Sequence, residues 1–217
     1  MALRTWPPLP EETIPSTLFS RGRSGRLILT KVVLLNGVGS SGKSSIAKAL
    51  QNTVSKPFLH VEMDAFLAMM PERYHNHPEG LSFEQHIENG KASTIAKTGV
   101  IAERTLTGMR HSVAAMAKAG NNLIVDDVLF GNTDTGDAPT LAEYRKLLRP
   151  FDFFLVAVFA PLDVLEERER LRGDRVPGLA RWQYERVHEQ MPYDFEVHTE
   201  NASPQQCAEQ IKVSLGL

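Results

Sequence analysis

From residue 27 onward, short apolar runs alternate with longer segments of helical periodicity. The first run is rich in β-branched residues and closes at Asn36-Gly37, which is typical of a buried strand that enters a turn. The predicted strands are 27–35, 58–63, 123–128, 153–159 and 195–199, and the predicted helices are 43–54, 91–119, 162–172, 179–190 and 203–215. Apolar strands separated by helices predict a parallel sheet covered on both faces, which binds its ligands at the carboxyl ends of the strands.

The composition is that of an ordinary globular chain. Of the 217 residues, 42% are hydrophobic and 23% are charged, so one sizeable core is expected. The formal net charge of −2 gives no general affinity for nucleic acid or for an anionic membrane, and neither is expected as a partner.

The chain is predicted to have a flexible N-terminal arm at 1–26 and a single domain at 27–217. The arm contains four prolines and little periodicity. Its four arginines leave an organelle transit peptide open, although Glu11 and Glu12 count against one. Cys207 is the one cysteine of the sequence, and no apolar run reaches about 18 residues. We therefore expect no internal disulfide, no transmembrane helix and a cytoplasmic location.

Residues 37–44 match the phosphate-binding P-loop pattern G-x-x-x-x-G-K-[ST], between a predicted strand and a predicted helix as the motif requires. Glycines allow backbone N–H groups to surround phosphate oxygens, and the helix N-terminus adds about half a positive charge. We predict that ATP binds here, with Lys43 on the β- and γ-phosphates and the Ser44 hydroxyl on Mg²⁺. The predicted nucleotide-binding residues are Gly37, Val38, Gly39, Ser40, Ser41, Gly42, Lys43, Ser44 and Ser45.

Asp64 directly follows the second predicted strand. In a parallel P-loop sheet, the strand beside the P-loop strand ends near the γ-phosphate, where a carboxylate can accept or orient the proton of an attacking hydroxyl. Asp64 also precedes the helix-like segment 65–70, and aspartate is a favoured helix N-cap. The spacing alone leaves catalysis and capping equally open. Glu62 is either a second polar group at the same edge or a strand residue that faces outward.

Asp126 and Asp127 end the third predicted strand. An apolar strand that ends in an acid is typical of a Walker B strand, whose carboxylate holds Mg²⁺ through its water shell. Two acids at a buried strand end are costly unless a cation or hydrogen-bond donors neutralise them. The pattern favours a metal role for one of the two over turn formation, without choosing between them. The predicted metal residues are therefore Ser44, Asp126 and Asp127.

Four arginines surround the glycine break at Gly173: Arg168, Arg170, Arg172 and Arg175. Arg168 and Arg172 are four positions apart and share one helix face. Arginines on a hinged segment can close over ATP and neutralise the transferring phosphoryl group. The glutamates between them are also typical of a solvated ion-pair helix. Downstream of a P-loop, the pattern favours a lid at about 168–190 in which Arg168, Arg172 and Arg175 assist catalysis.

These motifs resemble the chloramphenicol phosphotransferase family, P-loop kinases that phosphorylate a hydroxyl group of that antibiotic. The resemblance spans about 35–199 and rests on Leu35-Asn36-Gly37, Ser41-Gly42-Lys43-Ser44, Asp64, Ala68-Met69-Met70-Pro71, Ile124-Val125-Asp126-Asp127-Val128, Arg172-Gly173-Asp174-Arg175-Val176, Val187-His188-Glu189 and Tyr193-Asp194. It implies that Asp64 is the catalytic carboxylate and that Lys43 and Ser44 contact phosphate and Mg²⁺. The chain departs from the family pattern over 73–91, where the family builds much of its substrate pocket.

We therefore predict a three-layer α/β P-loop NTPase fold of the nucleoside/shikimate-kinase type, with a five-stranded parallel sheet of order 2-3-1-4-5 and a helical lid. The predicted function is transfer of the ATP γ-phosphate to a hydroxyl of a small organic acceptor, such as chloramphenicol or a similar antibiotic, and hence antibiotic resistance. A nucleotide-sugar, nucleoside or metabolite acceptor stays open, as does a nucleotide-binding regulatory protein with little transfer activity. Assembly into a homo-oligomer also stays open.

Overall fold

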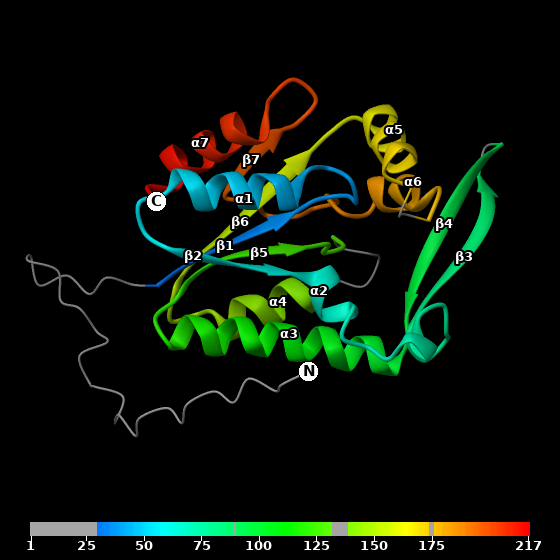
Figure 1. The fold of residues 1–217 in the computed structure, drawn as a ribbon, viewed down its shortest axis with the longest axis horizontal. Helices are drawn as coiled ribbons and strands as arrows, with labels where there is room; N and C mark the ends of the chain where they lie inside the picture. The colour runs from blue at the N-terminus through cyan, green and yellow to red at the C-terminus, as the bar shows by residue number, and fades with distance from the viewer. Residues whose placement is uncertain (1–29, 89, 132–138, 174–175) are drawn as a thin grey trace, which may run out of the picture.

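A central parallel sheet dominates the computed structural model, which describes residues 30–88, 90–131, 139–173 and 176–217 (Figure 1). The sheet order is β2-β5-β1-β6-β7. Counted along the chain within this sheet, the order is 2-3-1-4-5, so the predicted topology is confirmed. The five strands are β1 (Lys31–Asn36), β2 (Phe58–Glu62), β5 (Asn122–Asp127), β6 (Asp152–Phe159) and β7 (Phe195–His198).

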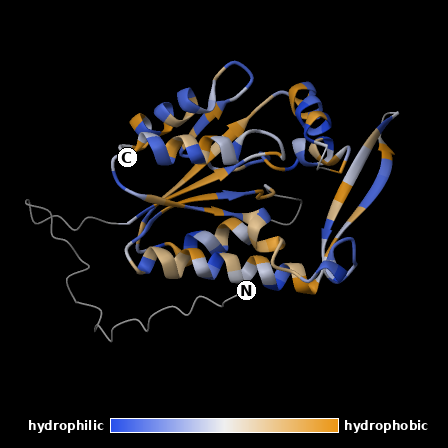
Figure 2. Ribbon diagram, in the orientation of Figure 1, coloured by the Kyte–Doolittle hydropathy of each residue, from blue (hydrophilic) through white to orange (hydrophobic). Residues whose placement is uncertain are grey.

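Helices cover both faces of the sheet. Helices α1 (Lys43–Thr53) and α7 (Pro204–Leu215) pack on one face, and α3 (Val100–Lys118) and α4 (Pro139–Leu147) pack on the other. Successive side chains of a strand point to opposite faces, so Ile124 joins the core under α1 and α7 while Val125 joins the core against α3 and α4. The central strands are hydrophobic along their length (Figure 2), because both of their faces are buried.

The remaining elements gather at the carboxyl edge of the sheet. They are α2 (Met63–Leu67), the 3-10 turn η2 (Glu72–Tyr74), the antiparallel hairpin of β3 (Leu81–Glu88) and β4 (Lys91–Thr98), and the pair α5 (Leu162–Arg172) and α6 (Leu179–Tyr184). The hairpin stands beside α5 and α6 (Figure 1). Thr94 joins them, since its backbone N–H donates to Gly178 O at 3.0 Å and its hydroxyl donates to Pro177 O at 2.6 Å.

Two predicted elements differ from the structure. The helix predicted for 91–119 is wrong over its first part, because Lys91–Thr98 is strand β4 and the helix begins at Val100, after Gly99. Lysine and alanine favour helix there, but the ladder with β3 and the contacts of Thr94 outweigh that preference. The helix predicted for 179–190 ends at Tyr184, where the N–H groups of Arg186 and Val187 both turn back to Gln183 O.

Some predictions fall on residues outside the described part of the chain. These are the arm at 1–26, the first residues of the strand predicted for 27–35, and Arg175 of the lid. Within the described residues, no helix combines the length and apolar character needed to cross a membrane. Cys207 is a buried free thiol on α7.

Candidate active site

The P-loop connects β1 to α1 in the geometry that its glycines permit. A Cβ on Gly37 would lie 2.5 Å from Val158 O, so only glycine fits beside β6. Gly42 precedes α1 with φ of 100°, a left-handed conformation that glycine adopts without strain. The Lys43 side chain is buried and folds back over the loop, with its Nζ donating to Gly37 O at 2.8 Å and Val38 O at 3.2 Å. The loop is therefore closed around its own lysine.

Asp126 brings the end of β5 against the P-loop. Its Oδ2 accepts a hydrogen bond from the Ser44 hydroxyl at 2.5 Å, and its Oδ1 lies 3.8 Å from Lys43 Nζ. The carboxylate is buried on the sheet face that α1 covers, so the lysine and the serine are its immediate neighbours. One acid thus meets both of the P-loop residues that the sequence assigns to phosphate and to Mg²⁺.

Asp127 points to the opposite face of the sheet. Its Oδ2 accepts from the Tyr144 hydroxyl of α4 at 2.8 Å, and its Oδ1 accepts from the Val128 N–H at 2.8 Å. Burial raises the pKa of the Asp127 carboxyl above its usual value, while the bonds from Tyr144 and Val128 act in the other direction. Of the two acids, the structure brings Asp126 to Ser44 and fixes Asp127 against α4.

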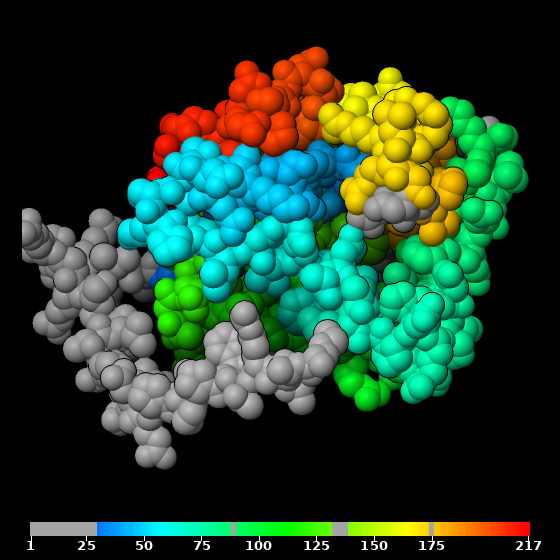
Figure 3. All heavy atoms as spheres, in the orientation of Figure 1, coloured from blue at the N-terminus to red at the C-terminus, as the bar shows by residue number. Residues whose placement is uncertain are grey.

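Asp64 lies at the end of the neighbouring strand, in the first turn of α2, and is exposed. Two residues earlier, Glu62 pairs in register with Asp126, so Asp64 lies just beyond the strand that borders β5. The N-cap position belongs to Glu62, whose side chain makes no capping bond, so the capping alternative for Asp64 is wrong. The molecular surface is hollowed between the α5–α6 segment and the segment from α2 to the hairpin (Figure 3).

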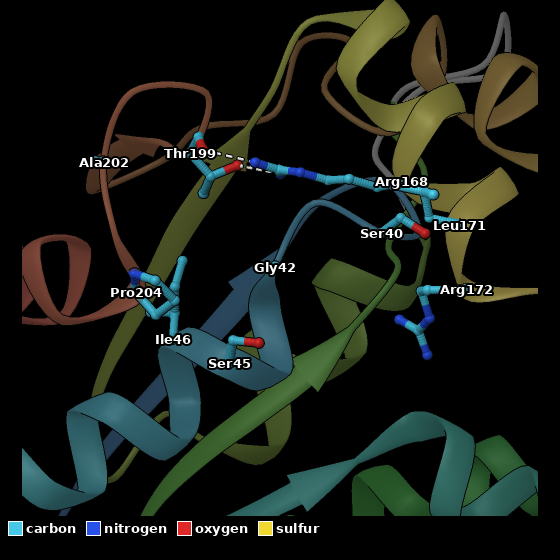
Figure 4. Close-up of a pocket in the computed structure, with 10 residues that line it drawn as sticks. All are labelled: Ser40, Gly42, Ser45, Ile46, Arg168, Leu171, Arg172, Thr199, Ala202 and Pro204. Atoms are coloured by element: carbon cyan, nitrogen blue, oxygen red, sulfur yellow. Dashed lines mark hydrogen bonds between the residues drawn. The ribbon is translucent and has the colours of Figure 1, made fainter.

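A cavity of about 410 Å³ opens between the P-loop, α5 and the loop after β7. Its lining includes Ser40, Gly42, Ser45, Arg168, Arg172 and Thr199. Arg168 reaches across it from α5, and its Nη1 and Nη2 donate to Thr199 Oγ1 and Thr199 O at 2.8 and 2.7 Å (Figure 4). The Thr199 hydroxyl in turn donates to Ser41 O at 2.9 Å. Arg168 therefore connects α5 to the loop after β7 and, through Thr199, to the P-loop, whereas Arg172 extends away from Thr199 (Figure 4).

Gln183 of α6 is a contact of the P-loop that the sequence did not single out. Its Oε1 accepts the Gly39 N–H at 2.7 Å, and the side chain is buried. The start of α6 is held in turn by Glu169 of α5, whose two carboxylate oxygens accept from the N–H groups of Gly178 and Ala180, each at 2.8 Å. The predicted lid is thus bonded directly to the phosphate-binding loop.

A second buried network lies behind the loop, centred on Asn36. Its Nδ2 donates to the Tyr193 hydroxyl at 2.9 Å, and that hydroxyl lies 2.7 Å from His188 Nδ1. Burial and the charge of Lys43 lower the pKa of His188 to about 4, so the imidazole is neutral at pH 7. The family resemblance includes His188 and Tyr193, and in the structure the Tyr193 hydroxyl lies between Asn36, at the end of β1, and His188.

Known protein structures show which class of fold this is. The APS kinase CysC of Mycobacterium tuberculosis, solved in complex with AMPPNP and APS, is 16% identical with a TM-score of 0.59, and the match covers 87% of this chain and 99% of that one. A gluconokinase from Sinorhizobium meliloti 1021 is 14% identical with a TM-score of 0.55, covering 87% and 93%. The fold is that of the P-loop kinases.

Sequence comparison then identifies the family. The family model described as "Chloramphenicol phosphotransferase-like protein" matches residues 30–216. The chain belongs to the chloramphenicol phosphotransferase-like family, as its motifs predicted. The Mycobacterium tuberculosis protein named "Putative O-phosphotransferase Rv2636" (strain ATCC 25618 / H37Rv) is 29% identical over 174 residues, which cover 78% of this chain and 75% of that protein. The chain is thus a phosphotransferase of this family on a nucleotide-binding P-loop fold.

Proposed function

We propose that the protein transfers the γ-phosphate of ATP to a hydroxyl group of a small organic acceptor. The observation that carries the proposal is the contact of Asp126 with both Ser44 and Lys43, next to strand β2, which Asp64 follows. A phosphate-binding loop, a carboxylate for the cation and a second carboxylate at the neighbouring strand end are the parts that phosphoryl transfer to an alcohol needs.

ATP is the proposed donor because a cavity beside the P-loop has room for a nucleoside and the loop carries buried hydroxyl groups that can meet phosphate. The cavity between Ser45, Arg168 and Thr199 has a volume suited to a nucleoside, with the triphosphate then on the loop backbone. The hydroxyls of Ser40 and Ser41 are buried and have no hydrogen-bond partner among the described residues. Buried hydroxyls are normally paired, and a bound phosphate would supply their acceptors. The cavity volume and the loop hydroxyls therefore both support a bound nucleotide.

Mg²⁺ fits the oxygen donors beneath the loop. The Ser44 hydroxyl and the Asp126 carboxylate are hard oxygen ligands of the kind that Mg²⁺ prefers, directly or through water. When bound, Mg²⁺ neutralises charge on the β- and γ-phosphates. Lys43 contributes the same kind of stabilisation from the protein side. Asp127 is not part of this proposal, because Tyr144 and Val128 already bind its two oxygens.

Asp64 is the proposed base for the acceptor. As the acceptor oxygen bonds to the γ-phosphorus, the bond from that phosphorus to the β–γ bridging oxygen breaks, the hydroxyl proton passes to Asp64 and ADP leaves. The segment after Asp64 carries the half-buried Phe66 and the exposed Met69. These side chains favour an apolar alcohol over a phosphorylated acceptor, which is why chloramphenicol or a similar antibiotic heads the candidates.

The test compares Asp64→Asn with a matched control. Asp163 is also an exposed aspartate in the first turn of a helix, α5, so Asp163→Asn removes an equivalent charge. Transfer is assayed with ATP and a panel of antibiotics, nucleosides, nucleotide sugars and metabolites, with chloramphenicol first. We expect Asp64→Asn to lower the transfer rate about 10²- to 10⁴-fold with ATP affinity unchanged, and Asp163→Asn to behave as the wild type. Transfer by Asp64→Asn at the wild-type rate would remove Asp64 from the mechanism.

A further inference from the structure

Three side chains that can bind a metal converge near the ends of β2 and β5, next to the P-loop. They are His60 and Glu62 of β2 and Asp126 of β5, and one donor atom from each lies within 4.8 Å of the others. Glu62 pairs in register with Asp126, and His60 is two residues before Glu62. Because alternate residues of a strand share a face, all three point to the side of the sheet that α1 covers. The sequence did not single out His60, since a histidine within an apolar strand carries no metal-site spacing.

His60 is the feature that points to a ligand. Its side chain is 9% exposed, and its Nε2 has no hydrogen-bond partner among the described residues. That nitrogen lies 3.9 Å from Asp126 Oδ2, and the other ring nitrogen lies 3.7 Å from Glu62 Oε1. Both separations exceed a hydrogen bond. A buried imidazole nitrogen without a partner carries a desolvation cost that a bound ion would offset.

We propose that His60, Glu62 and Asp126 form a binding site for a divalent transition-metal ion, with water in the remaining positions. An imidazole with two carboxylates suits Mn²⁺, Co²⁺ or Zn²⁺, whereas Mg²⁺ takes oxygen ligands alone. Ligands of one tetrahedral ion at about 2.1 Å are about 3.4 Å apart. The three donor atoms lie within 4.8 Å of one another, so they need to close by up to about 1.4 Å. This site goes beyond the proposed phosphotransferase chemistry, in which Asp126 acts with Ser44, Lys43 and Mg²⁺, and in which His60 and Glu62 take no part.

The surrounding charges are compatible with a cation. Glu62 and Asp126 supply two negative charges, and the neighbouring positive groups are Lys43, which is 3.8 Å from Asp126 Oδ1, and the exposed Lys48. Asp126 would be shared, with Oδ2 between the Ser44 hydroxyl and the ion. An ion here would therefore fix the orientation of the carboxylate that meets the P-loop.

The test is a Co²⁺ titration of the full chain without nucleotide, in excess Mg²⁺, followed by visible absorption and calorimetry. We expect one equivalent of Co²⁺ to bind with the absorption of an imidazole–carboxylate site. Losing a residue that only orients a metal ligand costs about 10- to 100-fold in affinity, so losing a ligand in His60→Ala or Glu62→Gln should cost at least as much. Glu62 is partly exposed, so Glu62→Gln keeps the test valid should His60→Ala fail to fold.

His198 supplies a matched control. It lies two residues from Glu196 on β7, and its Nε2 is 3.6 Å from Glu196 Oε1, so the pair repeats the spacing of His60 and Glu62 at an exposed place. We expect His198→Ala to bind Co²⁺ as the wild type does. Wild-type affinity in folded His60→Ala and Glu62→Gln would overturn the proposal, as would an equal loss in His198→Ala.

Discussion

Neutralising Asp126 and Asp127 one at a time should separate two adjacent acids that the sequence could not distinguish. In Asp126→Asn the carboxylate that accepts from Ser44 and faces Lys43 becomes an amide. In Asp127→Asn the amide oxygen can still accept from the Val128 N–H, and the Tyr144 hydroxyl can turn to accept from the amide nitrogen. Asp126→Asn therefore removes a negative charge from the proposed Mg²⁺ site. Asp127→Asn keeps the hydrogen bonds of residue 127.

The expected magnitudes follow from those contacts. A hydrogen bond to a charged group contributes about 1.5–3 kcal/mol, so Asp126→Asn should weaken the Mg²⁺-dependent part of ATP binding about 10- to 150-fold. Burial already disfavours the ionised form of Asp127, whose pKa it raises, so a neutral amide there costs little. We expect Asp127→Asn to leave ATP binding unchanged and to alter the free energy of unfolding by about 1 kcal/mol or less.

The assay is calorimetric titration of each variant with ATP at several Mg²⁺ concentrations, with urea denaturation to measure stability. It needs no knowledge of the acceptor. Equal loss of Mg²⁺-dependent ATP binding in the two variants would refute the assignment of Asp126 to the cation and of Asp127 to the contact with α4. So would wild-type binding in Asp126→Asn.

Three further predictions concern the lid and the network behind the loop. Arg168→Ala removes two hydrogen bonds to Thr199 and should raise the KM for ATP about tenfold or more. The control Arg170→Ala loses an exposed ion pair with Glu167 and should leave the KM unchanged. Equal effects of the two changes would contradict a role of Arg168 in ATP binding. Gln183→Glu places a negative charge against the Gly39 N–H, beside the proposed triphosphate site. Repulsion of the phosphates should weaken ATP binding about tenfold or more, as measured by fluorescence titration. Unchanged affinity would mean that the triphosphate lies elsewhere. Burial lowers the pKa of His188 from 6.5 to about 4, so the unfolded state binds more protons between these values and stability falls as the pH is lowered from 6.5 to 4. Urea denaturation at several pH values measures this. Between pH 6.5 and 4 the free energy of unfolding should fall by about 1–2 kcal/mol more in the wild type than in His188→Gln. Identical pH profiles of stability would contradict this prediction.

The sheet was predictable from sequence because its strands are buried on both faces. The runs 32–35 and 153–159 are apolar without interruption, and the P-loop pattern indicated which strand is central. The hairpin was not predictable from the same signal, because β3 and β4 are largely exposed and form a two-stranded sheet apart from the central one. The sequence Asn89-Gly90 between them is a strong hairpin signal, and it would have predicted a strand at the start of the segment 91–119 in place of a helix.

The active site, like the fold, was predictable from the sequence only in part. Strand alternation predicts that Asp126 and Asp127 point to opposite faces, but the face toward the P-loop depends on how α1 packs, which the sequence pattern does not encode. Gln183 could not be found from pattern, because its contact with Gly39 depends on where α5 and α6 meet the loop. Arg168 was predicted as a lid residue, and that role stays a prediction alongside its observed bonds to Thr199.

The most direct test of the central claim is a mass-spectrometric search for products that have gained one phosphoryl group, with ATP, Mg²⁺ and the acceptor panel. We predict that at least one alcohol gains this mass, that ADP forms in equal amount, and that Lys43→Ala abolishes both. A screen in which no acceptor gains the phosphoryl group and none raises ATP consumption above background would contradict the claim. It would favour a nucleotide-binding regulatory protein.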